Sequence, residues 1–187
     1  MTIQFNIPTN LTLLRIALIP LLTVVFYLPW HYANLACTLI FIFAGITDWL
    51  DGYLARKLNM ETPFGAFLDP VADKLMVAIV LVLIVQQQAT PTLAIAAAII
   101  IGREITIASL REWMAEIGQR AKVKVSQLGK WKTTAQMVSI TMLLYHEDIL
   151  GLPINQIGYG LLYIAAVLTL WSMINYLRAA IAVINKG

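Results

Sequence analysis

Four aspartates, with the small residues between them, are the part of this sequence best suited to chemistry. Asp48 and Asp51 are three residues apart, Asp69 and Asp73 are four apart, and both pairs adjoin strongly apolar sequence. At these spacings each pair lies on one face of a helix. A carboxylate near a hydrocarbon region must meet a cation, a metal ion or water. Two converging acidic faces could bind hard divalent cations, which prefer oxygen ligands and offset the repulsion between the acids.

The elements that must position these residues are membrane helices. The chain has 187 residues, of which 60% are hydrophobic and only 12% are charged. A soluble domain is about half apolar and about a quarter charged. We therefore predict an all-α integral membrane protein with a single domain over residues 1–187. The net charge of +3 suits an anionic lipid surface, and we expect no nucleic-acid partner.

Six apolar stretches are long enough to cross a hydrocarbon core of about 30 Å. We predict these transmembrane helices at about 11–28, 33–54, 67–85, 92–114, 128–145 and 157–184. Pro8, followed by Thr9 and Asn10, predicts the start of the first helix. Residues 57–66 are predicted to be a polar connector in which Pro63 and Gly65 break the helix.

The basic residues predict the orientation of the chain. The turns near 28–33, 86–92 and 146–156 contain no lysine or arginine, so all thirteen basic residues lie toward the other ends of the spans. Because positive charge marks the cytoplasmic side, we predict that both termini and the aspartates face the cytoplasm. Arg15, one turn into the first span, has two open interpretations: it snorkels to the interface, or it contacts a phosphate.

A second informative stretch joins the fourth and fifth spans. Arg103 and Arg111 are eight residues apart and share a helix face, while Lys130 and Lys132 open the next span. Arginine offers a planar fork to phosphate and lysine a compact charge, so these four residues could bind a phosphate group. The alternative is positive-inside bias with contacts to lipid headgroups, which suits residues 120–124 better.

The aspartates belong to a longer pattern, and that pattern resembles a known family. Asp48-x-x-Asp51-Gly52-x-x-Ala55-Arg56, eight residues, then Gly65-x-x-x-Asp69-x-x-x-Asp73 matches every fixed position of the CDP-alcohol phosphatidyltransferase signature. The resemblance implies that the four aspartates hold one or two Mg2+ or Mn2+ ions and that Asp73 is the general base. It also implies a binding site for the nucleotide part of CDP-diacylglycerol, formed by Thr9, Asn10, Thr12, Asp51, Gly52, Ala55, Arg56 and Gly65.

One departure from the family pattern lies at the start of the chain. Many members have asparagine directly after the early proline, whereas this chain has Thr9 there and Asn10 next. The two glycines of the motif also have a physical role, because without a Cβ they let a nucleotide approach the backbone.

Four longer stretches, one of which overlaps the signature, resemble the bacterial branch of the family that makes phosphatidylglycerophosphate. They are FNIPTNLTLLR, GAFLDPVADK, REITIASLREWMAE and GKWKTTAQ. The resemblance implies transfer of a phosphatidyl group from CDP-diacylglycerol to glycerol 3-phosphate, with release of CMP. It further implies a multi-pass protein of the bacterial inner membrane, a homodimer, and a glycerol 3-phosphate site at Arg103, Arg111, Lys130 and Lys132.

Two alternatives stay open at this point. The first is the same chemistry with another acceptor: inositol phosphate, serine, choline or phosphatidylglycerol. The second is a cation-coupled transporter that uses the carboxylates as an ion path. Transporters often contain structural repeats and broken helices near the midplane. This sequence shows no repeat and has its acids toward the ends of spans, which favours an enzyme.

Overall fold

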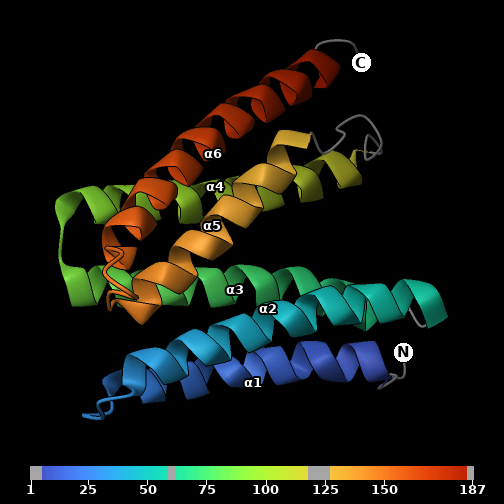
Figure 1. Cartoon of the computed structure of the whole chain (residues 1–187). Helices are drawn as coiled ribbons and strands as arrows, with labels where there is room; N and C mark the ends of the chain where they lie inside the picture. The colour runs from blue at the N-terminus through green and yellow to red at the C-terminus, as the bar shows by residue number, and fades with distance from the viewer. Residues whose placement is uncertain (1–5, 59–61, 118–126, 185–187) are drawn as a thin grey trace.

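Six helices make up the part of the chain that the computed structural model describes, which is residues 6–58, 62–117 and 127–184. They are α1 (Ile7–Tyr27), α2 (Ala33–Leu58), α3 (Pro63–Gln88), α4 (Pro91–Glu116), α5 (Gln127–Tyr145) and α6 (Ile154–Ile184). The helices alternate in direction, so both ends of the chain lie at the same end of the bundle (Figure 1). The all-α prediction fits this architecture.

The core lies where α3 meets its neighbours. α3 packs against α1, α4 and α5, while α2 packs on α1 and α5, and α6 on α4 and α5. Leucine, isoleucine and valine from five helices fill the space between them. Fully buried examples are Leu22, Val80, Ile84, Ile100, Leu143 and Leu162. Burial of each such side chain stabilises the fold by about 1.5–3 kcal/mol relative to its exposure to water.

The outer surface is apolar as well. Trp49 is 68% exposed, and Phe67, Val167 and Trp171 are similarly open. Among the described residues, four stretches are long and apolar enough to cross a membrane: Ile7–Tyr27, Ala33–Ala55, Pro91–Glu116 and Ile154–Arg178. Many exposed large apolar side chains on long apolar helices are typical of a surface that faces lipid. The chain therefore fits a multi-pass membrane protein, although α3 and α5 are not among these four stretches.

Two helices begin earlier than the sequence predicted. Asn6 accepts a hydrogen bond from the Thr9 backbone N–H at 3.0 Å, and α1 starts at Ile7 with Pro8 in its first turn. Thr62 accepts one from the Gly65 N–H at 3.0 Å, and α3 starts at Pro63. The prediction that Pro63 and Gly65 lie in a connector and break the helix was wrong, because both residues belong to the first turn of α3. Proline is accepted in the first helical turn because the N–H it lacks would have no partner there.

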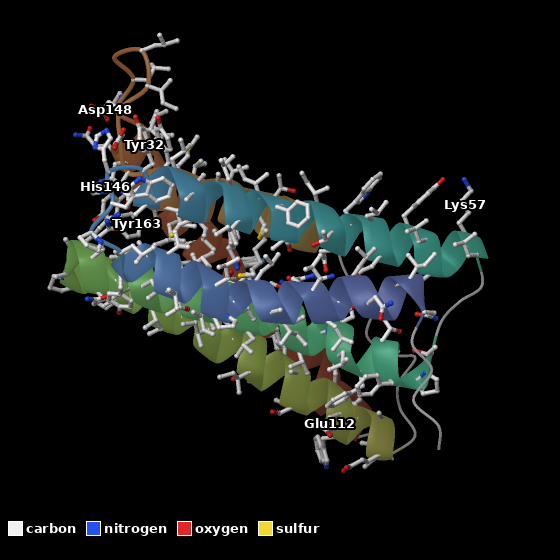
Figure 2. The ribbon with its side chains drawn as sticks, turned by 90° about the horizontal axis from the view of Figure 1, so that it is seen from below. Tyr32, Lys57, Glu112, His146, Asp148 and Tyr163 are labelled. Carbon is white, nitrogen blue, oxygen red and sulfur yellow. The ribbon has the colours of Figure 1, made fainter. Side chains whose placement is uncertain are left out.

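The end of the bundle opposite the chain termini is held by three consecutive glutamines at the end of α3. Each one hydrogen-bonds to a different neighbouring segment, at distances between 2.7 and 3.3 Å. Gln86 pairs with Tyr27 of α1, Gln87 with Asn34 of α2, and Gln88 with the Leu143 carbonyl of α5 and with Asn155 of α6. Figure 2 shows Tyr32, His146 and Asp148 at this end, with Lys57 at the other.

Candidate active site

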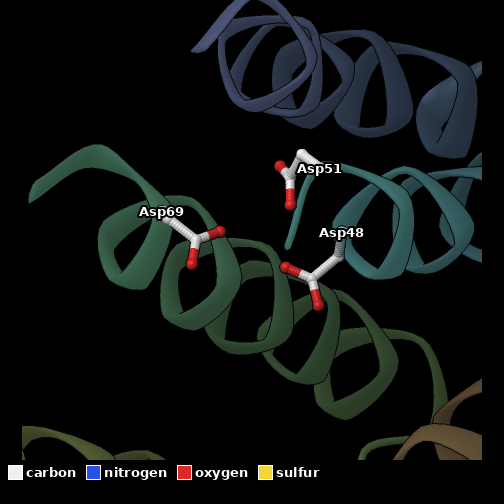
Figure 3. Close-up of side chains that lie close together, drawn as sticks. All are labelled: Asp48, Asp51 and Asp69. Carbon is white, nitrogen blue, oxygen red and sulfur yellow. The ribbon is translucent and has the colours of Figure 1, made fainter. Parts of the chain in front are cut away.

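Three of the four aspartates converge between α2 and α3. Asp48, Asp51 and Asp69 each offer one oxygen to a group in which all three oxygens lie within 4.8 Å of one another. Figure 3 shows the three carboxylates directed into the space between the two helices. The Asp51 side chain is 5% exposed, whereas those of Asp48 and Asp69 are 44% and 50% exposed. The cluster is therefore closed on the Asp51 side and open on the other.

Arg15 of α1 is the counterion of this cluster. Its Nη1 donates to Asp48 Oδ1 and, at 3.2 Å, to Asp69 Oδ1, while its Nη2 donates to Asp51 Oδ2. The Arg15 side chain is only 2% exposed. The interpretation that Arg15 snorkels to the interface was wrong, because its guanidinium points inward to the carboxylates. One buried arginine thereby joins three helices at the motif.

A cavity of about 320 Å³ adjoins the cluster at the end of the bundle that holds the chain termini. Three helices and the cap of α3 contribute to its wall. The lining residues are Pro8, Thr9, Thr12, Asp51, Gly52, Ala55, Thr62, Gly65, Ala66 and Asp69. Six of the eight residues proposed for the nucleotide lie here. Of the other two, Asn10 is exposed outside this wall, and the side chain of Arg56 lies outside the described part of the structure.

Close packing of α1 on α3 explains why a glycine stands at position 65. A Cβ built there would lie 3.0 Å from the hydroxyl oxygens of both Thr9 and Thr62. Those two hydroxyls are themselves 3.2 Å apart. Thr12 completes this side of the cavity, because its hydroxyl donates to Asp51 Oδ2 at 3.1 Å. The threonines of α1 therefore orient both the cap of α3 and the most buried carboxylate.

Asp73 is placed apart from the other three aspartates. It lies one turn after Asp69 on α3 and is not part of the group within 4.8 Å. Instead it lines a smaller cavity of about 170 Å³ together with Asp48 and Arg15. Thr133 and Met137 of α5 form the opposite wall. Asp48 and Arg15 thus stand at the junction between Asp73 and the three-carboxylate cluster.

The structure separates the predicted basic residues into two places. Lys132, 3% exposed, donates to Glu104 Oε1 at 2.9 Å, and Arg103 donates to the same oxygen at 2.5 Å. Arg111 instead faces α6, where its Nε donates to the Tyr176 hydroxyl at 3.2 Å. The side chain of Lys130 lies outside the described residues. Arg103 and Lys132 therefore share one carboxylate oxygen, and Arg103 also donates to the Ser172 hydroxyl of α6 at 3.5 Å. Arg111 does not join this group and is paired with Tyr176.

Sequence reasoning missed two residues at this site. It gave Arg15 no carboxylate partner, although an arginine in an apolar span needs an anion when it does not reach water. It also passed over Glu104, which lies inside apolar sequence directly after Arg103. An acid at membrane depth is itself a signal of a buried partner. Neither partner could be identified without knowing that α1 packs on α2 and that the Lys132 side chain of α5 reaches α4.

The donor set fits a hard divalent cation. Asp48, Asp51 and Asp69 supply only carboxylate oxygens, which suit Mg2+ and Mn2+ better than softer metals. Two of these side chains are about half exposed, so an ion could enter from the open side and retain water ligands. Mg2+ commonly keeps several waters and binds through one or two carboxylates plus substrate phosphates.

Comparison with known proteins agrees with this chemistry. The family model for CDP-alcohol phosphatidyltransferase matches residues 5–171. A protein of Pectobacterium atrosepticum is 56% identical over 177 residues, which cover 95% of this chain and 96% of that protein. A Salmonella choleraesuis protein is 55% identical over the same shares of the two chains. Both relatives carry the name CDP-diacylglycerol–glycerol-3-phosphate 3-phosphatidyltransferase. This chain therefore belongs to the CDP-alcohol phosphatidyltransferase family.

Proposed function

We propose that this chain transfers a phosphatidyl group from CDP-diacylglycerol to glycerol 3-phosphate, which gives phosphatidylglycerophosphate and CMP. The observation that carries the proposal is the convergence of Asp48, Asp51 and Asp69 beside a cavity lined by the family motif. Relatives that are 55–56% identical along nearly the whole chain and named for this reaction support the acceptor.

The reaction needs one bond to form and one to break. A hydroxyl oxygen of glycerol 3-phosphate attacks the β-phosphorus of CDP-diacylglycerol, and the bond from that phosphorus to the oxygen bridging to CMP breaks. We assign the hydroxyl proton to Asp73, because its cavity adjoins the cluster through Asp48. A general base needs reach to the hydroxyl as well as a suitable pKa.

Asp48, Asp51 and Asp69 would hold the divalent ion in this scheme. The family resemblance also implied Asp73 as a ligand, but Asp73 lies outside this group of three carboxylates. When bound, the ion draws charge from the diphosphate and makes CMP a better leaving group. Thr12 and Arg15 keep the carboxylates in position through their hydrogen bonds to Asp51. We assign the nucleotide to the cavity of about 320 Å³ lined by Thr9, Gly52, Ala55 and Gly65.

An apolar groove supports a lipid donor. It has a volume of about 390 Å³ and runs between α2 and α5, lined by Ile42, Ile46, Trp49 and Val138 among others. The groove shares Phe41, Gly45, Thr133 and Met137 with the smaller cavity that contains Asp48 and Asp73. A donor whose diphosphate carries acyl chains could therefore place its head at the aspartates and its chains toward the bilayer.

The proposal also includes the number of membrane spans, the membrane and the orientation of the chain. We assign all six helices as transmembrane spans in the inner membrane of a bacterium, with both termini and the aspartates on the cytoplasmic side. The asymmetry of the basic residues supports this orientation. By the family resemblance we also expect a homodimer.

The decisive experiment measures CMP release from CDP-diacylglycerol by purified protein in detergent, with a panel of acceptors. We expect release with glycerol 3-phosphate and loss of activity when a chelator removes divalent ions. Faster reaction with inositol phosphate would contradict the named acceptor. A failure to release CMP with any acceptor would contradict phosphatidyl transfer and favour the transporter alternative.

The proposed glycerol 3-phosphate site can be tested separately from the metal site, because it is made of basic residues. A charge-assisted contact to phosphate contributes about 1.5–3 kcal/mol, or roughly ten- to a hundredfold in binding. We expect Arg111→Ala and Lys130→Ala to raise the KM for glycerol 3-phosphate by about that factor, with much less effect on the KM for CDP-diacylglycerol. Arg178→Ala, which removes an exposed arginine of α6, is the matched control. A rise in the lipid KM instead would contradict this assignment.

A further inference from the structure

The guanidinium of Arg15 lies at the three carboxylates that could also bind a metal ion. It donates to one oxygen of each of the three clustered carboxylates, Asp48, Asp51 and Asp69. These are the same three residues whose oxygens lie close enough together to hold an ion. The charge of the three carboxylates is therefore partly neutralised before any metal binds.

We propose that Arg15 is the resident counterion of the carboxylate cluster: it holds α1, α2 and α3 together when no metal is bound, and it lowers the affinity of the cluster for a divalent cation. This inference rests on the metal site in the proposed function. It makes Arg15 a positioning residue rather than a ligand of substrate.

Repulsion among the three carboxylates requires a cation in the metal-free protein. Three carboxylates within 4.8 Å repel one another strongly unless a cation lies among them. Asp51, with a side chain that is 5% exposed, has little water to screen it. Removal of one partner from a buried ion pair is strongly destabilising because it leaves an uncompensated charge. Arg15 therefore supplies the cation that keeps the metal-free cluster folded.

Arg15 and a divalent ion would compete for the same carboxylate oxygens. Arg15 engages Asp48 Oδ1, Asp51 Oδ2 and Asp69 Oδ1, so an ion that binds these oxygens competes with the guanidinium for their lone pairs. The guanidinium and the ion also repel each other at short range. In addition, Arg15 Nε is buried without a hydrogen-bond partner. A buried donor without a partner costs free energy. The hydrogen bonds between Arg15 and the three aspartates therefore leave part of the guanidinium unsatisfied, and an incoming ion can rearrange them.

The test compares purified proteins in detergent by two measurements. Mn2+ titration followed by electron paramagnetic resonance gives metal affinity, and the midpoint of thermal unfolding is measured with chelator and with Mn2+. For Arg15→Gln we expect about tenfold tighter Mn2+ binding, from the loss of one nearby positive charge. We also expect a melting midpoint lowered by about 5 °C or more in chelator, with a larger rise on addition of Mn2+ than in the wild type.

Two further variants separate charge from geometry. Arg15→Lys keeps the charge but cannot bridge three carboxylates with a planar fork. It should bind Mn2+ within about threefold of the wild type, because its charge still opposes the ion, yet melt at a lower temperature in chelator. Arg178→Gln removes an arginine that is exposed on α6 and should change neither measurement.

The results for the two Arg15 variants and the wild type support or overturn the inference as follows. Mn2+ affinity in Arg15→Gln that equals or falls below the wild-type value, or an unchanged midpoint in chelator, overturns the inference. If Arg15→Gln folds only with Mn2+, the inference is supported. If it folds in neither condition, Arg15→Lys decides, and wild-type behaviour of that variant in both measurements overturns the inference. Wild-type protein that binds no Mn2+ would instead contradict the metal site itself.

Discussion

The Nζ of Lys132 on α5 lies 2.9 Å from Oε1 of Glu104 on α4. Lys132 is 3% exposed, and Arg103 shares the same carboxylate oxygen. Glu104 therefore holds two cations that the sequence assigned to the acceptor site. Its carboxylate therefore fixes the positions of these two cations relative to each other.

Neutralisation of Glu104 should destabilise the protein. We expect Glu104→Gln to reduce the free energy of unfolding by about 2–4 kcal/mol, since it leaves the buried Lys132 ammonium without its anion. The measurement is thermal or denaturant unfolding in detergent. Glu112→Gln, at an exposed position on the same helix (Figure 2), is the matched control. The double variant Glu104→Gln/Lys132→Met should recover part of the loss, and strict additivity of the two changes would contradict the pairing.

Substitution of Asp73 should abolish catalysis without removing metal binding. We expect Asp69→Asn to weaken Mn2+ binding by tenfold or more, because an amide lacks the charge that attracts the ion. Asp73→Asn should nearly abolish CMP release and yet retain Mn2+ affinity within about threefold, because Asp73 lies outside the three-carboxylate group. Calorimetric or resonance titration checks both variants. Equal loss of metal affinity in the two would show that Asp73 is a metal ligand as well.

A methyl group at position 65 should disturb the nucleotide cavity. The new Cβ of Gly65→Ala would lie 3.0 Å from the hydroxyls of Thr9 and Thr62, so these two side chains must shift by a few tenths of an ångström and their hydrogen bonds are disturbed. We expect a cost of about 1–3 kcal/mol in stability and a raised KM for CDP-diacylglycerol. Gly160→Ala on α6 is the control, because its Cβ would meet no atom within 4 Å. Steady-state kinetics with CDP-diacylglycerol should show the contrast, and an unaffected Gly65→Ala would rule out the close approach.

Thiol labelling tests the orientation of the helices. In a Cys37→Ala background, a cysteine at Asp148 should react with an impermeant reagent added outside intact spheroplasts. A cysteine at Lys57 should react only after the membrane is opened. Both positions are exposed and lie at opposite ends of the bundle (Figure 2). The reverse pattern would put the aspartates on the outer side, away from the cytoplasmic supply of nucleotide-activated lipid.

The helices themselves could be predicted from sequence because apolar length is a local property. The expected spans at 33–54 and 128–145 agree closely with α2 (Ala33–Leu58) and α5 (Gln127–Tyr145). The start of α3 was misplaced because Pro63 and Gly65 each disfavour the middle of a helix but not its first turn. Thr62, whose hydroxyl caps that turn, was the local signal for the correct start.

The site could be predicted in part for a different reason. Spacing places Asp48 with Asp51 on one helix face, but it cannot say that Asp69 joins them and that Asp73 faces the next cavity. That distinction depends on the rotation of α3 against α2. The direction of Arg111 likewise depends on α6, since Tyr176 lies 65 residues further along the chain. Contacts between segments that are distant in the sequence therefore decide which aspartates cluster and where Arg111 points.

The three glutamines at the end of α3 have a mechanical consequence. They tie α3 to α1, α2, α5 and α6 at the end of the bundle remote from the aspartates. Helices joined at one end can separate only by pivoting about it, so a given rotation produces its largest displacement at the other end. Residues 86–88 thus fix the remote end, and the ion pairs of Arg15 and of Lys132 with Glu104 are the contacts whose loss would let the helices move furthest apart.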